Sequence, residues 1–332
     1  MKKSMQKFMH GLNKERKTIK LIQMKKAIFY TSMVRFIRLP LLLLILIMGV
    51  NELMAQDSTK EKASVLKKNS YIKNTFDGNY IIDNQTVMVP IKGTFEFDIQ
   101  HRFGTIEHGW KDLGGLFASA NMLLGFSYVP IKDLQFGFGA TNDRMQINGN
   151  LKYALLKQIK NNRMPVSVTL FANSVMDTRA KNSSLPIINV QDRFSFFSQL
   201  IIARKITESF SLQVAPSYSY FNNVEGYYNE NKVIQAKTNN GHLAVSIAGK
   251  YKLTEGLSLI VNYDQPITVH PMNNPNPNIS LGLDMKTSGH DFQIFVGNYG
   301  YLLPQNNNVY NRNDFSKSQF LIGFNISRLW NF

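Results

Sequence analysis

The sequence predicts an all-β protein: an antiparallel up-and-down transmembrane β-barrel of about twelve strands, after a cleaved N-terminal signal peptide. Three observations support this fold class. Apolar residues occupy every second position over most of the chain, the connections alternate between short and long, and a short apolar segment follows a basic N-terminus.

Composition and charge exclude several classes of protein. The 332 residues include no cysteine, which excludes disulfides, thiolate metal sites and a cysteine-borne lipid anchor. The net charge of +16 is uneven: residues 1–32 hold nine Lys/Arg and one acid, a net +8, and residues 33–55 add +1. Subtraction leaves +7 for residues 56–332, so we expect no nucleic-acid partner.

The apolar run LLLLILIMGV at 41–50 follows Arg35 and Arg38 and precedes Ala55. A basic region, a short apolar core and a small residue at the cut are typical of a secretory signal peptide. A transmembrane helix needs about 20 apolar residues, which disfavours an anchor. We expect a signal peptide over 33–55, cut after Ala55, and a basic extension over 1–32, unless translation starts at Met24 or Met33.

Residues 56–92 are expected to form a periplasmic lead-in, with short apolar pieces at 80–82 and 87–89 that pack at the barrel mouth. The barrel is expected over 93–332. Alternating apolar residues indicate its twelve strands, at 95–99, 122–128, 134–140, 147–155, 166–172, 194–202, 210–218, 243–251, 257–263, 279–285, 292–296 and 320–326.

The connections between these strands differ in length by parity. Short connections lie at 130–132, 206–208, 253–256 and 287–289, and long ones at 104–117, 177–192, 221–240, 265–278 and 299–317; a tight turn at 141–144 is the exception. Short periplasmic turns and long external loops are typical of outer-membrane barrels, and an even strand number places both barrel ends in the periplasm. We therefore expect the outer membrane of a Gram-negative-type bacterium.

The inward phase of the strands is polar or small, and its charged and amide residues are the lumen-facing candidates: Glu96, Asp98, Gln100, Arg102, Lys152, Lys250, Asp264, Asp284, Lys286 and Asp291. This mixed charge sets no clear ion preference. Glycines at 125, 137, 139, 282, 297 and 323 share the inward phase and leave room there. Pro216 is expected to mark a bulge or a strand end, because proline removes a ladder hydrogen bond.

The last strand continues in phase to Trp330 and Phe332. An apolar last strand with a terminal aromatic residue resembles the signal by which outer-membrane barrels are recognised for assembly. Outer-membrane lipid and the barrel-assembly machinery are therefore the expected partners, and tyrosines at strand ends (128, 153, 218, 251 and 263) suit an interfacial girdle.

Several stretches resemble a family of predicted outer-membrane β-barrel proteins catalogued as a domain of unknown function. The most specific are Gln100-His101-Arg102-Phe103-Gly104 and the closing segment 323–328, GFNISR, and the resemblance covers most of residues 90–332. It implies location and fold, and it carries no substrate or catalytic residues.

Motifs that carry chemistry are sparse. His101 and His108 are expected to join a polar network at the rim, His290 a turn and His270 a loop. We expect no metal, no cofactor and no enzymatic activity. The sequence favours a narrow channel or transporter for small solutes. Two alternatives remain: a structural barrel that docks a partner through its loops or lead-in, and a barrel enzyme.

The first strand offers a test of the assigned faces. Phe97 should face lipid, where an arginine near the midplane costs ~2–4 kcal/mol, so Phe97→Arg should impair folding or assembly. Gln100 should face the lumen, and Gln100→Arg should be tolerated. Heat-modifiable mobility of the folded barrel measures both; a lethal Gln100→Arg beside a silent Phe97→Arg would reverse the faces.

Overall fold

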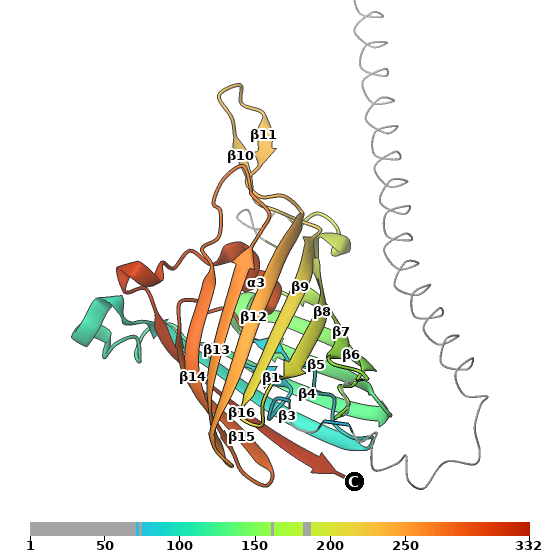
Figure 1. The fold of residues 1–332 in the computed structure, drawn as a ribbon. Coiled ribbons are helices and arrows are strands. Elements are labelled where there is room, and N and C mark those ends of the chain that lie inside the picture. The colour runs from blue at the N-terminus through green and yellow to red at the C-terminus, as the bar shows by residue number, and fades with distance from the viewer. Residues whose placement is uncertain (1–70, 73–74, 161–162, 182–186) are drawn as a thin grey trace, which may run out of the picture. The chain divides into compact units, whose positions relative to one another are not determined.

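Twelve antiparallel strands close into one barrel in a computed structural model that describes residues 71–72, 75–160, 163–181 and 187–332 (Figure 1). The predicted signal peptide and basic extension lie outside the described residues. The number and order of the strands confirm the prediction. The strands are β3 Thr94–Thr105, β4 Asn121–Ile131, β5 Leu134–Thr141, β6 Gln146–Leu156, β7 Ser167–Asp177, β8 Phe194–Lys205, β9 Phe210–Phe221, β12 Gly241–Thr254, β13 Leu257–Pro266, β14 Asn278–Lys286, β15 His290–Gly297 and β16 Leu321–Asn331.

The barrel closes where the first wall strand, β3, pairs with the last, β16. The pairing runs from Thr94 opposite Asn331 to Thr105 opposite Leu321, with one irregularity near Leu321. Closure leaves no unpaired strand edge, which is the condition for crossing a bilayer with strands.

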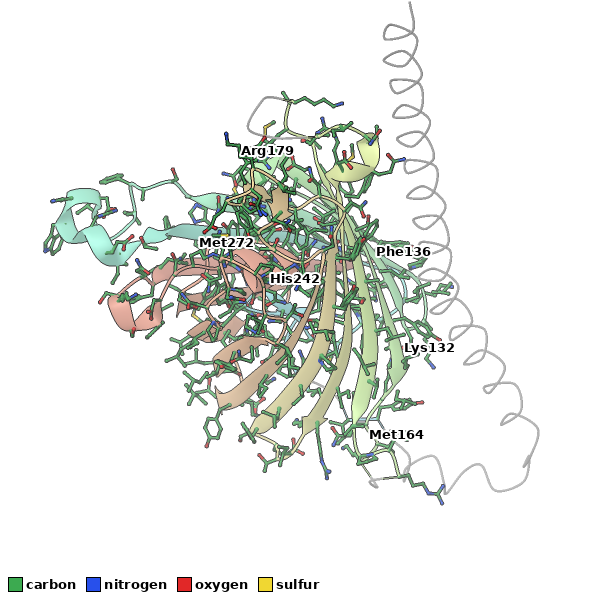
Figure 2. The ribbon with its side chains drawn as sticks, turned by 90° about the horizontal axis from the view of Figure 1, so that it is seen from above. Lys132, Phe136, Met164, Arg179, His242 and Met272 are labelled. Atoms are coloured by element: carbon green, nitrogen blue, oxygen red, sulfur yellow. The ribbon has the colours of Figure 1, made fainter. Side chains whose placement is uncertain are left out.

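The two faces of the wall differ as the alternation predicted. On β5, Phe136 is 50% exposed and points outward from the wall, whereas its neighbour Gln135 is buried inside (Figure 2). On β3 the buried positions alternate with less buried ones and are Thr94, Glu96, Asp98, Gln100 and Arg102. The outer face is therefore an apolar band and the inner face is largely polar.

The external connections, including the tight turn between β5 and β6, carry further elements. These are the 3-10 turns η1 Ile106–Asp112, η2 Asp143–Met145, η3 Val190–Arg193 and η4 Phe315–Lys317, the helix α3 Pro304–Tyr310, and a hairpin of β10 Gly226–Tyr228 and β11 Ile234–Ala236 that stands beyond the barrel (Figure 1). In the described part of the chain no helix has the length and apolar content to cross a membrane.

Pro216 neither ends a strand nor forms a bulge, contrary to expectation. It lies within β9 opposite Val245 of β12, in an uninterrupted register. Toward β8, the pairs Gln199–Ser217 and Ile202–Val214 share one register, and the two intervening positions lack ladder pairing. Because proline has no N–H, the ladder has a local gap here, and the pairs on either side of the gap keep the same register.

The lead-in departs most from its prediction. The strands β1 Tyr80–Ile81 and β2 Asn84–Gln85 form a hairpin whose surroundings, from Thr75 to Val87, are mostly buried inside the barrel rather than packed at its mouth. We call residues 75–89 the plug. The inner wall is correspondingly less polar than expected, because it carries large apolar residues that face the plug: Phe171, Phe197, Ile201, Ile260 and Phe295.

Candidate functional site

The plug contacts strands on several sides of the barrel. The Asn84 side chain donates to Asn262 (3.1 Å) and Asp264 (2.8 Å) of β13 and accepts from Gln199 of β8 (3.1 Å). The carbonyl of Gln85 accepts from Gln213 of β9 at 2.8 Å. The plug therefore fills the lumen and is hydrogen-bonded to it through amides and carboxylates.

The tip of the plug is held in a strained conformation. Ile82 has φ +63°, a region that costs a β-branched residue about 1–3 kcal/mol. Its N–H donates to Gln293 of β15 (3.0 Å), and its carbonyl accepts from Asn325 of β16 (2.5 Å). Arg102 of β3 also reaches this carbonyl, at 3.5 Å. Three wall strands thus hold the tip in place.

Asp83 links the plug to the external side of the barrel. Its carboxylate accepts from Tyr299 at 2.9 Å, from Asn307 of α3 at 2.9 Å and from Asn262 at 3.3 Å. Burial, and then the nearby Asp264, raises the pKa of Asp83 to about 7, while Arg102 and the Tyr299 and Asn307 hydrogen bonds act in the opposite direction. The charge of this side chain therefore changes within the neutral pH range.

At the other end of the plug, Asp77 lies near the periplasmic turns. It pairs with Lys250 at 2.9 Å and accepts from Ser258 at 3.3 Å, and its backbone carbonyl accepts from Lys286 at 3.1 Å. Among the described residues this is the one salt bridge in which both side chains are largely buried. Both ends of the plug are therefore fixed by charged groups.

Apolar packing contributes most to docking of the plug. Phe76, Ile81, Ile82 and Val87 are each at most 5% exposed and pack against the apolar patch of the inner wall. Complete burial of such a side chain is worth ~1.5–3 kcal/mol, so the four contribute about 6–12 kcal/mol. This packing therefore opposes spontaneous withdrawal of the plug.

The external loop 298–320 closes the lumen from the other side. Leu302 and Leu303 pack with Leu123 and Val175 of the inner wall. The amides of α3 point inward: Asn306 donates to Gln146 at 2.8 Å, besides the Asn307 contact with Asp83. The plug and α3 therefore meet inside the barrel.

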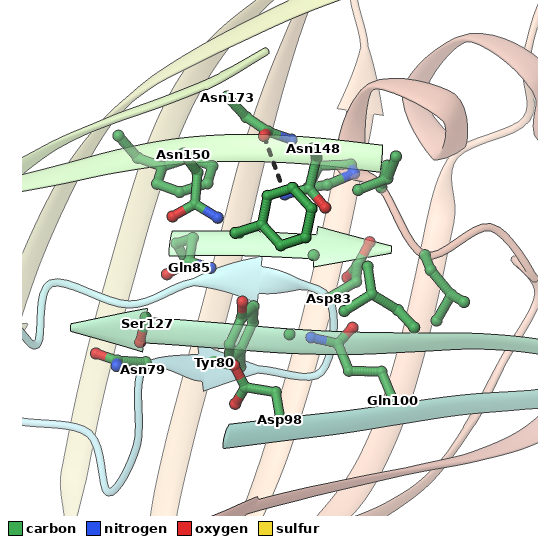
Figure 3. A pocket seen from close by; sticks show the side chains of 18 of the residues that line it. Asn79, Tyr80, Asp83, Gln85, Asp98, Gln100, Ser127, Asn148, Asn150 and Asn173 are labelled. Carbon is green, nitrogen blue, oxygen red and sulfur yellow. Dashed lines mark hydrogen bonds between the residues drawn. The ribbon is translucent and has the colours of Figure 1, made fainter. Parts of the chain in front are cut away.

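A small cavity remains between the plug and the wall formed by β3–β7 (Figure 3). The space open to the centres of water molecules in this cavity is about 30 Å³, which is room for roughly two waters. The labelled lining includes Tyr80 of the plug, Asp98 and Gln100 of β3, and Asn148 of β6. The cavity thus has room for water-sized species and not for a molecule as large as a sugar.

A family model described as "Membrane bound beta barrel domain (DUF5777)" matches residues 76–330. The chain belongs to this family. The resemblance noted in the sequence is thereby confirmed, and the protein is an outer-membrane β-barrel. The match begins at Phe76, ahead of the first wall strand, so it includes all of the plug except Thr75.

Solved structures with related architecture include three channels. The NanC porin has 8% sequence identity and TM-score 0.43, covering 71% of this chain and 99% of its own. An outer membrane channel from Pseudomonas putida F1 has 11% identity and TM-score 0.44, covering 73% and 97%. The TodX monoaromatic hydrocarbon channel has 10% identity and TM-score 0.37, covering 74% and 92%. These scores are too low to bear on the solute, and no curated protein matches the chain significantly.

The predicted lumen-facing residues of this DUF5777 barrel are placed as follows. Nine are buried on the inner face, and Lys286 is exposed at the periplasmic mouth. The buried nine are Glu96, Asp98, Gln100, Arg102, Lys152, Lys250, Asp264, Asp284 and Asp291. Gln100 lines the small cavity, so the expected tolerance of Gln100→Arg must be revised: there is little space for a longer side chain. Trp330 lies against Phe95, and Phe332 is exposed.

Among the described residues, no group of three or more His, Cys, Asp or Glu is suited to hold a metal ion. His101 lies on the outer face, stacked on Phe324 at 5.0 Å, which corrects the expected polar network; His108 is exposed in η1. His290 begins β15 beside Arg328 (3.1 Å), where the wall pairing extends into the expected turn.

His270 meets His242, a residue that the sequence did not single out. Their ring centroids are 4.3 Å apart at the external side. The N–H of Asn239 donates to Nδ1 of His270 at 3.2 Å, so the proton of the neutral ring lies on Nε2. Burial lowers the pKa of His270, with Arg312 as the lesser cause, and this favours the neutral ring. Without a lone pair on Nε2, the pair is poorly suited to bind a metal.

The geometry of the plug predicts an engineered cross-link. An ideal Cβ on Gly78 lies 4.0 Å from Cβ of Asp291, within the ~3.5–4.5 Å of disulfides. Because the chain has no cysteine, Gly78→Cys/Asp291→Cys should oxidise to one intramolecular disulfide, detected as loss of both alkylation sites by mass spectrometry. Gly78→Cys/Phe292→Cys, with the second thiol on the outer face, should stay reduced. Free thiols in the first pair after oxidation would place the plug elsewhere.

Proposed function

We propose that this barrel is a channel for small polar solutes, closed at rest by the plug and opened when the plug is withdrawn. One observation carries the proposal: separate chain segments, the plug and α3, fill the lumen, and the wall's own side chains do not. A twelve-stranded barrel is wider than the eight-stranded ones that side chains fill. Removal of the plug exposes the apolar patch of Phe171, Phe197, Ile201, Ile260 and Phe295 beside a wall of amides and charged groups, and these polar groups suit polar solutes.

The position of the plug's N-terminal end favours withdrawal toward the periplasm. The N–H of Ile72 donates to the carbonyl of Gln158 at 2.8 Å, and Tyr71 pairs with Ile159, in the connection between β6 and β7. The chain thus enters the barrel at its periplasmic end. Since docking is worth several kcal/mol, the plug opens when a partner or a force acts on the chain ahead of it.

Planar-bilayer recording of a weakened plug tests this function. Phe76→Ser/Ile81→Ser removes two buried apolar side chains, each worth about 2–5 kcal/mol, and should raise the frequency of discrete conductance steps well above wild type. Ile188→Ser/Val190→Ser, at exposed positions of an external loop, should match wild type.

The cross-link supplies the decisive control. In the weakened background, oxidised Gly78→Cys/Asp291→Cys should be silent, and a reductant should restore conductance in the same protein. If the weakened plug is as silent as wild type, or if the oxidised form conducts like the reduced form, the plug does not gate a channel.

Opening should also depend on pH. The docked pKa of Asp83, about 7, exceeds the 3.8 of a solvated aspartate, so docking is strongest below pH 4 and weakens as pH rises through 7. The groups that face it are Asp264, Arg102 and Tyr299. The weakened plug should therefore open more often at pH 8 than at pH 5. Asp83→Asn in that background should reduce this dependence; an unchanged profile would assign it to another group.

A docking role has one specific observation in its favour. The β10–β11 hairpin stands beyond the barrel with Tyr228 72% exposed and Ile234 66% exposed (Figure 1). Exposed apolar side chains on a projecting hairpin suit a protein partner outside the cell. Cross-linking through Tyr228→Cys on intact cells should then capture one stoichiometric partner, and the absence of any adduct would leave the channel as the sole proposal.

A further inference from the structure

The cavity beside the plug exists because two facing strands lack side chains at this place. Gly125 of β4 pairs directly with Gly139 of β5. An ideal Cβ on Gly139 would lie 2.6 Å from Oδ1 of Asn148, and one on Gly125 would lie 3.2 Å from Oδ2 of Asp98. Asp98 and Asn148 therefore border the part of the cavity where the paired glycines leave only backbone, and they lie on opposite sides of it (Figure 3).

Four buried oxygens at the cavity have no hydrogen-bond partner among the described residues. They are Oδ1 of Asp98, Oε1 of Gln100, Oε1 of Gln135 and Oδ1 of Asn148, on side chains 3%, 2%, 4% and 7% exposed. All four residues line the cavity. A buried acceptor without a partner costs about 1–3 kcal/mol, more for a charged one, so four together are expected only where something satisfies them.

The orientations of two of the three amides, Gln135 and Asn148, are fixed by hydrogen bonds from their nitrogens. Nε2 of Gln135 donates to Oγ of Ser127, and Nδ2 of Asn148 donates to Asn173 at 3.2 Å. The amide oxygens are consequently left for the cavity. Lys152 does not fill this role, because its Nζ donates to the backbone and side-chain oxygens of Asn79, each at 3.3 Å.

We propose that this cavity is a binding site for a small monovalent cation, Na⁺ or K⁺, with Asp98 as the charged ligand. Amide oxygens from among Gln100, Gln135 and Asn148, with one water, complete the coordination. Hard cations take oxygen ligands, and a single carboxylate with amide oxygens suits a monovalent ion better than Ca²⁺, whose sites use several carboxylates. The room for about two waters fits one ion with a water.

Charge in the interior supports a cation over a neutral ligand. The buried charged side chains of the wall strands are five carboxylates (Glu96, Asp98, Asp264, Asp284 and Asp291) and three cations (Arg102, Lys152 and Lys250). The plug adds Asp77 and Asp83 and no basic residue between 75 and 89, so these strands and the plug together hold seven carboxylates and three cations. The docked plug therefore makes the interior attractive to positive ions. The site does not depend on whether the barrel conducts.

Thermal unfolding of the full chain in detergent tests the site without any conductance measurement. Wild type in KCl should melt about 2–4 °C higher than in the same concentration of N-methyl-D-glucamine chloride, whose cation is too large for the cavity. Asp98→Asn should abolish this difference, whatever its effect on the absolute Tm. Asp177→Asn, whose carboxylate pairs with Arg179 at the external end of β7, should retain it.

A second variant keeps the test valid if Asp98→Asn does not fold. Asn148→Ala removes one amide oxygen by a small truncation and should reduce the difference between the two salts. Equal melting of wild type in both salts would overturn the site, as would a full difference retained by Asp98→Asn or by Asn148→Ala. A silent bilayer recording bears on the channel alone, so the two proposals fail separately.

Discussion

The requirement that every backbone N–H and C=O be paired in lipid determines the architecture of this protein. Only a closed ladder meets it with strands, and here the ladder closes between β3 and β16. Closure at twelve strands has a cost, because the enclosed space is too wide for wall side chains alone to fill. The plug and α3 fill that space, so the polar interior and its buried charges follow from the same constraint.

The strands were predictable because each has to satisfy one rule over about ten residues. A residue such as Phe136 faces lipid and its neighbour Gln135 faces inward. Because the same alternation is repeated along the strands, it can be recognised in the sequence. A slip of one position would reverse every side chain, so the register leaves a strong trace in the sequence. The parity of connection length added the topology.

The plug and α3 left no such trace. β1 and β2 have two residues each, too few for a periodicity, and α3 has seven residues that include three consecutive asparagines. The available signal was indirect. Phe171, Phe197 and Ile260 fall on the inward phase, where contact with water would be unfavourable for large apolar side chains. Their position therefore indicates that an apolar segment fills the lumen beside them. The sequence around Ile82 does not predict its positive φ, because Gln293 and Asn325, from distant parts of the chain, hold it in that conformation.

The location of those contacts has a consequence for biogenesis. The residues that hold the plug tip come from β3 and β16, which pair where the barrel closes, and from β15, which pairs with β16. Their binding site for Ile82 does not exist until the last strand has met the first. The docked plug and the closed seam therefore stabilise each other. A barrel that closes without its plug lacks the contacts that link β3, β15 and β16 from the inside.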